Sequence, residues 1–235
     1  MNLTISKSKI KTLESCPRCF LWQYIERRKP DIPPAVITKV GKDVHEIFDK
    51  FYDHIVLEQM LSIKEINENP FEYFKSVMNV LPQYKNIYDL FCEFQSRRWK
   101  LTKNKDEFMP VLKEHKFIVE DNVGIVDVIH YDNGEYMVLD YKSSVSNPTN
   151  LRFELNYYVK LINDSKILDK PVKFITAYGY KDGSLFHESI NIKSYNSMLK
   201  KIEDFRKNDW GTMEFPKNIG YSCSWCQYLP SCNKL

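Results

Sequence analysis

The stretch VGIVDVIHYDNGEYMVLDYKSS, residues 123–144, decides the fold of this chain. It holds two runs rich in β-branched and aromatic residues, separated by Asn133-Gly134, a pair typical of a two-residue type I′ turn. Such a short loop fixes the strand register, and this register places Asp127 opposite Asp140. Apolar residues lie on both faces of the hairpin. We therefore expect it to be an interior part of a sheet that is covered on both sides.

The predicted register brings two carboxylates together. Directly opposed side chains of an antiparallel pair have Cβ atoms roughly 4.5–5.5 Å apart, where like charges destabilise the pair. Two carboxylates forced together inside a protein need a shared proton or a bound cation. Lys142 follows Asp140 by two residues and lies on the same face. This pattern favours a cation bound by Asp127 and Asp140; the alternative is an ordinary charged hairpin.

Composition and length indicate a globular, intracellular protein. The chain has 235 residues, of which 43% are hydrophobic and 14% aromatic, enough for a substantial core. Its formal net charge is +3, so any nucleic-acid affinity must come from local clusters of basic residues. No apolar run approaches the roughly 20 residues of a membrane span, and MNLTISKSKI lacks a signal peptide's apolar core. We expect a soluble, cytoplasmic protein with a single domain over residues 1–235.

Six cysteines in an intracellular chain indicate a metal site more than disulfide bonds. Near the N-terminus, SCPRCF holds Cys16 and Cys19, and CSWCQYLPSC at the C-terminus holds Cys223, Cys226 and Cys232. A zinc site would join the two C-x2-C pairs and leave Cys232 spare. A four-iron cluster would instead combine Cys16 with the three C-terminal cysteines. The remaining cysteine, in the apolar run LFCEF, is expected to be a buried core thiol.

An acid at the end of one strand, followed by acid-x-Lys on the next, resembles the PD-(D/E)XK nuclease superfamily. The matching segments are VGIVD, which ends at Asp127, and LDYKSS, which contains Asp140 and Lys142. The resemblance implies an α/β fold, in which a mixed central sheet is flanked by helices. In this chain the core would carry a helical insertion at about 60–110 and a cysteine-rich tail at 219–235.

The opening, ISKSKIKTLESCPRCFLWQYI, looks like the start of RecB/AddB-type nuclease domains and of the related CRISPR-associated exonucleases. In these proteins an N-terminal cysteine, followed by proline, joins a C-terminal C-x2-C-x(n)-C. The family usually has a non-ligand residue at the position of Cys19, so zinc stays open as the alternative metal. The resemblance implies a 4Fe–4S cluster that clamps the two ends of the chain, on Cys16, Cys223, Cys226 and Cys232.

Two further motifs supply expected site residues. GKDVHEIF lies on a helix predicted over about 39–60, and its G-x3-H resembles the family motif in which the histidine binds the catalytic metal. This implies a ligand role for His45; the alternative is a packed core histidine. NPTNLRFELNYYVKLIND reads as a helix and resembles the family's Q-x3-Y motif, with Tyr158 matching and Glu154 replacing glutamine. A carboxylate cannot donate the hydrogen bonds of an amide, so Glu154 either adds negative charge near the metal or turns away.

The basic stretch SRRWK ends the predicted insertion. Basic residues interleaved with an aromatic suit single-strand binding, because the ring stacks on a base while the charges follow phosphates. The alternative is a helix end whose tryptophan anchors the core. The DNA-binding candidates are Arg97, Arg98, Trp99 and Lys100.

Together these resemblances imply a metal-dependent DNA nuclease, an exonuclease more than an endonuclease, acting on single strands or duplex ends. The catalytic residues would be Lys142, Asp127, Asp140, Tyr158 and Glu154. The ligands of Mg²⁺ or Mn²⁺ would be His45, Asp127, Asp140 and the backbone carbonyl of Tyr141. One alternative is a catalytically silent DNA-binding scaffold subunit of a repair, recombination or CRISPR-adaptation complex. Another is a zinc-stabilised protein-interaction module.

Overall fold

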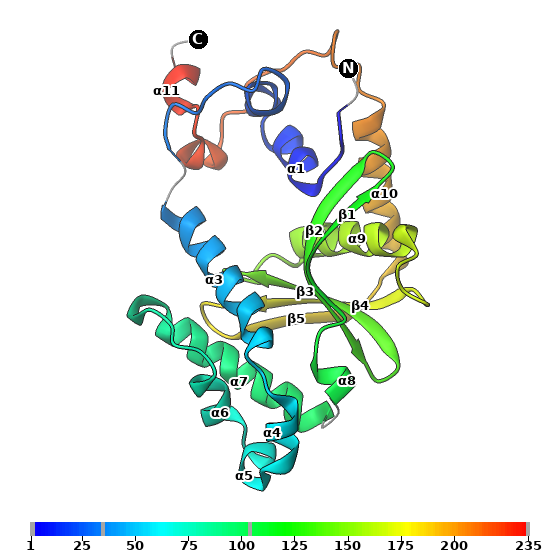
Figure 1. Cartoon of the computed structure of the whole chain (residues 1–235). Coiled ribbons are helices and arrows are strands. Elements are labelled where there is room, and N and C mark those ends of the chain that lie inside the picture. Colours follow the sequence, from blue (N-terminus) through cyan, green and yellow to red (C-terminus); the bar gives the residue numbers. More distant parts are fainter. Residues whose placement is uncertain (1–2, 34–35, 103–104, 234–235) are drawn as a thin grey trace.

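A five-stranded mixed sheet, in the order β1-β2-β3-β4-β5, lies at the centre of the computed structural model, which describes residues 3–33, 36–102 and 105–233 (Figure 1). Neighbouring strands are antiparallel except β3 and β4, which are parallel. The sheet has helices on both faces, as the sequence predicted. Its strands are β1 (Leu112–Val119), β2 (Asn122–Asp132), β3 (Glu135–Lys142), β4 (Val172–Gly179) and β5 (Ser184–Ser189).

The β2–β3 hairpin has the predicted turn and register. Asn133 and Gly134 have φ angles of 49° and 80°, and a type I′ turn requires positive φ at both positions. Pairing runs from Asp132 and Glu135 to Val128 and Leu139 without a shift. Both strands are interior to the sheet. The prediction of an interior hairpin is therefore confirmed.

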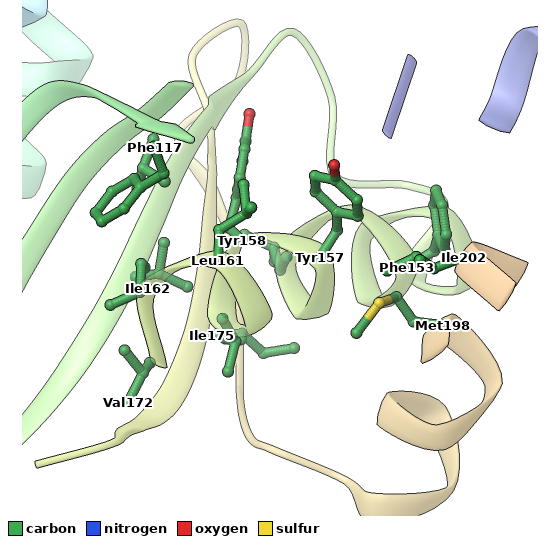
Figure 2. Close-up of a cluster of buried hydrophobic side chains, with 14 of the residues drawn as sticks. Phe117, Phe153, Tyr157, Tyr158, Leu161, Ile162, Val172, Ile175, Met198 and Ile202 are labelled. Atoms are coloured by element: carbon green, nitrogen blue, oxygen red, sulfur yellow. The ribbon is translucent and has the colours of Figure 1, made fainter. Parts of the chain in front are cut away.

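One face of the sheet is covered by α9 (Pro148–Ser165), and α10 (Ile192–Arg206) packs against α9 and against α1 (Lys7–Ser15). α9 forms the crossover between the parallel strands β3 and β4. It begins at Pro148, directly after Asn147, whose side chain accepts a hydrogen bond from the backbone N–H of Asn150. Most of its side chains are buried against the sheet and α10 (Figure 2). This rigid seating fixes every side chain that α9 presents toward β3.

The other face carries α3 and a group of short and long helices that fills the predicted insertion, apart from residues 103–104, which lie outside the described ranges. Stacked aromatic rings join these helices to the sheet, with 4.6 Å between the ring centroids of Phe94 and Tyr178. The helix predicted over 39–60 instead ends at Asp53 and is followed by a separate short helix. The elements are α3 (Val36–Asp53), α4 (Leu57–Ser62), α5 (Lys64–Glu68), α6 (Phe71–Ser76), η2 (Pro82–Tyr84), α7 (Lys85–Thr102) and α8 (Lys105–Phe108).

Segments from the two ends of the chain lie against each other beyond the sheet (Figure 1). α1 ends at Ser15 because Cys16 is extended before Pro17, where the helical conformation is disfavoured. The hydroxyl of Tyr228 donates to the carbonyl of Arg28 at 3.1 Å, which holds the two segments together. The elements there are α2 (Pro17–Phe20), η1 (Leu21–Ile25), η3 (Tyr221–Trp225) and α11 (Leu229–Cys232). No helix of the described ranges is both long and apolar enough to cross a bilayer.

Candidate active site

Asp127 and Asp140 lie where the β2–β3 ladder ends. Beyond the last paired residues, Asp127 Oδ2 accepts a hydrogen bond from the backbone N–H of Tyr141 at 2.7 Å. Both acids are nearly buried, with 6% of Asp127 and 1% of Asp140 exposed. Burial raises the pKa of Asp127, and the charge of Asp140 raises it further. The structure thus brings together two buried carboxylates, and Asp140 disfavours the negative charge of Asp127.

His45 of α3 lies beside Asp127 and comes from the face of the sheet opposite to α9. Its Nδ1 lies 3.4 Å from Asp127 Oδ2, and its Nε2 lies 3.0 Å from the carbonyl oxygen of Tyr141. Burial lowers the pKa of His45, but Asp127 and Glu114 outweigh burial and raise the pKa to about 10. The imidazole is therefore protonated at neutral pH and donates from both nitrogens when no cation is bound.

Glu114 of β1 belongs to this group, although the sequence analysis did not select it. Its Oε1 lies 3.9 Å from His45 Nδ1. The β1–β2 pairing is interrupted at Glu114, between the pairs that Lys113 and His115 form, and its φ is 44°. A positive φ is uncommon for a residue with a side chain. Extending the register argument to the β1–β2 hairpin would have placed Glu114 opposite Asp127.

The donor set fits a hard divalent cation. Ligand atoms of His45, Glu114 and Asp127 all lie within 4.8 Å of one another. Asp140 Oδ2 is buried and lies 2.5 Å from Lys142 Nζ, yet it accepts no hydrogen bond of acceptable geometry from the described residues. Carboxylate oxygens with one imidazole suit Mg²⁺ or Mn²⁺. The candidate ligands form two groups. Asp140 lies beside Lys142 and Lys7, whereas His45, Glu114 and Asp127 lie beside one another.

Glu154 of α9 does not turn away from the site. Its carboxylate accepts hydrogen bonds from Lys142 at 2.7 Å, from Lys7 at 3.3 Å and from Lys11 at 2.5 Å. Burial raises the pKa of Glu154, but Lys142 and Lys7 outweigh it and lower the pKa to about 2. Lys7 and Lys11 reach this site from α1, and no sequence motif marked them as site residues.

Lys142 and Tyr158 lie beside Asp140. Burial lowers the pKa of Lys142, but Asp140 and Glu154 give a net increase, so the ammonium form prevails at neutral pH. The ring of Tyr158 lies 4.2 Å from the Nζ of Lys7, within cation–π distance. Burial, with the charge of Asp140, raises the pKa of Tyr158 and keeps its hydroxyl protonated. Both side chains thus stay protonated and can donate hydrogen bonds in this site.

The SRRWK segment does not form the expected stacking platform. Trp99 is fully buried, and its indole N–H donates to the backbone carbonyl of Asn67 at 3.1 Å. Arg98 contacts the buried ring of His130, with 3.0 Å between Nη2 and Nδ1. Trp99 therefore anchors the helical core, as in the alternative interpretation, and its ring has no exposed face on which a base could stack in this structure. Two residues of the segment remain exposed on α7, Arg97 and Lys100.

Five of the six cysteines line one cavity of about 400 Å³ between the N- and C-terminal segments. The sulfur atoms of Cys19 and Cys226 are 3.1 Å apart. Burial raises the pKa of the Cys19 thiol, and Cys226 adds to this effect. At Cys16, burial also raises the pKa, but hydrogen bonds, the largest from the backbone of Asn218, lower it overall. The sixth cysteine, Cys92, is a buried core thiol, as predicted.

Sequence comparison identifies the family. The model of the PD-(D/E)XK nuclease superfamily matches residues 4–233. No curated protein matches the chain in sequence. Among solved structures, the one described as "Crystal structure of SSO0001" is similar, with 12% sequence identity and a TM-score of 0.40, over 100% of this chain and 87% of that chain.

Proposed function

Because the chain belongs to the PD-(D/E)XK nuclease superfamily, we propose that it is a metal-dependent deoxyribonuclease, an exonuclease on single strands or duplex ends. The observation that carries this function is the buried pair Asp127 and Asp140, with the ammonium group of Lys142 beside it. Opposed buried carboxylates destabilise a metal-free fold, and a cation removes that cost. The exonuclease mode is supported by the resemblance of the opening segment to RecB/AddB-type domains.

The cation ligands are His45, Asp127, Asp140 and the carbonyl of Tyr141, and Glu114 lies close enough to join them. A bound Mg²⁺ or Mn²⁺ polarises the scissile phosphate and lowers the pKa of water. For His45 to bind a cation, its imidazole must lose a proton. For the Tyr141 carbonyl to bind one, its hydrogen bond with His45 must break. Cation binding therefore releases a proton and becomes weaker as the pH falls.

Lys142 supplies positive charge where negative charge develops on the phosphate. Its ammonium group is fixed from two sides, by Asp140 and by Glu154. Because it is protonated, it cannot take a proton from water; it donates hydrogen bonds that orient the water and stabilise the transition state. The hydroxyl of Tyr158 positions the substrate phosphate from α9. Glu154 is a positioning residue, because it acts through Lys142.

The cysteine cavity holds a structural 4Fe–4S cluster on Cys16, Cys223, Cys226 and Cys232 in this proposal. In a tetrahedral zinc site, a Zn–S distance of about 2.3 Å places the thiolates roughly 3.8 Å apart. Among the described residues, no three cysteine sulfurs lie within 4.8 Å of one another, although the sulfurs of Cys19 and Cys226 are 3.1 Å apart. A cluster spaces its thiolates more widely, since each binds a different iron atom.

A cleavage assay with end-labelled DNA tests the proposed activity. Single and double strands labelled at the 5′ or the 3′ end are incubated with the purified protein and Mg²⁺, Mn²⁺ or EDTA. We expect metal-dependent products that shorten progressively from one end. A wild-type protein that binds DNA but does not cleave it with either metal would instead identify the scaffold alternative. Internal cuts in a circular strand would replace the exonuclease mode with an endonuclease mode.

A further inference from the structure

Three ammonium groups converge on the single carboxylate of Glu154. The Nζ atoms of Lys7, Lys142 and Lys11 lie 3.3, 2.7 and 2.5 Å from its oxygens. Two of these lysines also face Asp140, with Nζ of Lys7 3.6 Å from Oδ1. In the metal-free protein, two carboxylates therefore balance three ammonium groups. This is more positive charge than one positioned catalytic lysine requires.

The charge balance changes when the catalytic cation is bound. Asp140 then neutralises the cation, and Glu154 alone faces the three lysines. The local excess is two positive charges, whereas each phosphodiester of a nucleic acid carries one negative charge. Lys142 faces Asp140 at the scissile position, so one positive charge serves that phosphate. The second excess positive charge comes from Lys7 and Lys11 of α1, and it is available to a second phosphate.

The lysines form a row from the buried site to the surface. The exposed fraction of the side chain rises from 19% at Lys7 to 40% at Lys11. These residues are one helical turn apart on α1 and share a face. Beyond Lys11, a cavity of about 280 Å³ opens between α1, α9 and α10, with hydroxyl and amide side chains on its walls, among them Thr149, Asn150 and Ser194. Its walls also hold the ion pair of Lys201 and Glu14, in which the ammonium group donates to the carboxylate at 2.9 Å. Hydroxyl and amide groups bind phosphate and sugar oxygens.

We propose that Lys7 and Lys11 bind the phosphate next to the scissile one, and that the substrate strand runs from the active site across α1 toward this cavity. The inference rests on the proposed nuclease function and adds a strand path to it. Glu154 holds the two ammonium groups in the site before the strand binds. When the strand binds, its phosphates neutralise part of the positive charge of these two lysines.

The test measures DNA affinity in Mg²⁺ with a fluorescent single strand whose linkages are phosphorothioates, which slow cleavage. Fluorescence anisotropy gives the association constant at salt concentrations from about 50 to 200 mM. Lys11→Ala should reduce the slope of log K against log salt by about 0.7, the value for one phosphate contact of a single strand. Because both lysines bind the same phosphate, combining it with Lys7→Met should leave the reduction near about 0.7. A merely structural role would weaken binding without changing the slope.

Lys9→Ala is the matched control. Lys9 lies on the same helix and carries the same charge, but its Nζ donates to Thr4 rather than to Glu154. It should keep the wild-type slope. If Lys7→Met unfolds the chain, as its melting curve would show, the partly exposed Lys11 provides the test alone.

The outcomes separate this inference from the proposed function. A wild type with no DNA affinity at low salt contradicts the nuclease function itself. A wild type that binds, with unchanged slope and affinity in the Lys11→Ala variant, overturns the strand path and leaves the nuclease function standing. A slope reduced equally by Lys9→Ala also overturns it, because the effect would then reflect the charge of α1 as a whole.

Discussion

The two candidate metal regions of this chain differ in how completely the protein organises them. In the active site, hydrogen bonds already join the residues. The Asp127 carboxylate accepts one from the backbone N–H of Tyr141, and the Lys142 ammonium group donates one to Glu154. These residues project from strands of the sheet and from helices that pack on its two faces. In the cysteine cavity, the thiols come from short segments at the two ends of the chain and surround about 400 Å³.

This difference indicates what a bound metal contributes in each region. Packing builds the active site without a metal, so the cation should serve chemistry and relieve repulsion. The cysteine region consists of short helical segments from the two ends of the chain, so a metal there should contribute to folding itself. Loss of the first metal should remove activity and keep the fold, whereas loss of the second should weaken the fold.

The largest expected effect is the loss of activity in Asp127→Asn. Loss of partners that merely support metal ligands costs 10–100-fold, so removing a ligand should reduce cleavage by more than about 100-fold. In EDTA the variant should keep a stability close to that of the wild type, because relief of the repulsion from Asp140 is offset by loss of the charged partner of protonated His45. Cleavage rates and melting curves in EDTA check both parts; an active variant contradicts the assignment.

Cys232→Ala should have the largest effect on stability. Loss of a link between the two chain ends costs on the order of 4 kcal/mol, as for a disulfide that closes a long loop. For a chain of this size that corresponds to a melting temperature lower by roughly 8–16 °C. The variant should also lose the brown colour expected of anaerobically purified wild type. A colourless wild type with stoichiometric zinc contradicts the cluster.

Glu154→Gln should have an intermediate effect, because it leaves three lysines without their shared carboxylate. We expect a stability loss of about 1–3 kcal/mol at neutral pH and about tenfold slower cleavage. Since the pKa of Glu154 falls from 4.5 to about 2 on folding, its stabilisation is present above pH 4.5 and is lost as the pH falls toward 2. Urea unfolding at neutral and acidic pH should show the wild-type advantage shrinking; an advantage that grows in acid contradicts the lysine contacts.

The smallest effect is expected for Cys19→Ala, which should cost about 1 kcal/mol or less. Under the cluster proposal its thiol lies beside Cys226 without binding iron, so iron and acid-labile sulfide should match the wild type. The zinc alternative predicts the reverse, with Cys19 essential and Cys232 dispensable. Comparing the metal content of these two variants therefore distinguishes the two sites directly.

The sequence predicted the centre of the fold because the relevant interactions are local. The Asn133-Gly134 turn determines its own dihedral angles, and a two-residue loop leaves one register, so the pairing followed from a short segment. The order of the motifs along the chain indicated the family in the same way. Helix ends were less predictable: the helix carrying His45 ends at Asp53, and just beyond it the backbone N–H of Val56 donates to the hydroxyl of Tyr73, a residue distant in sequence.

The tertiary structure alone decided which charges surround the catalytic residues. Lys7 and Glu154 are 147 positions apart, and no local pattern in α1 shows that its lysines reach α9. Trp99 looked like a binding residue because sequence shows the charges beside it but not the aromatic core beneath it. The sequence thus determined the hairpin and its acids through backbone geometry. Packing of distant helices selected their charged neighbours, because electrostatic partners depend on distance in space.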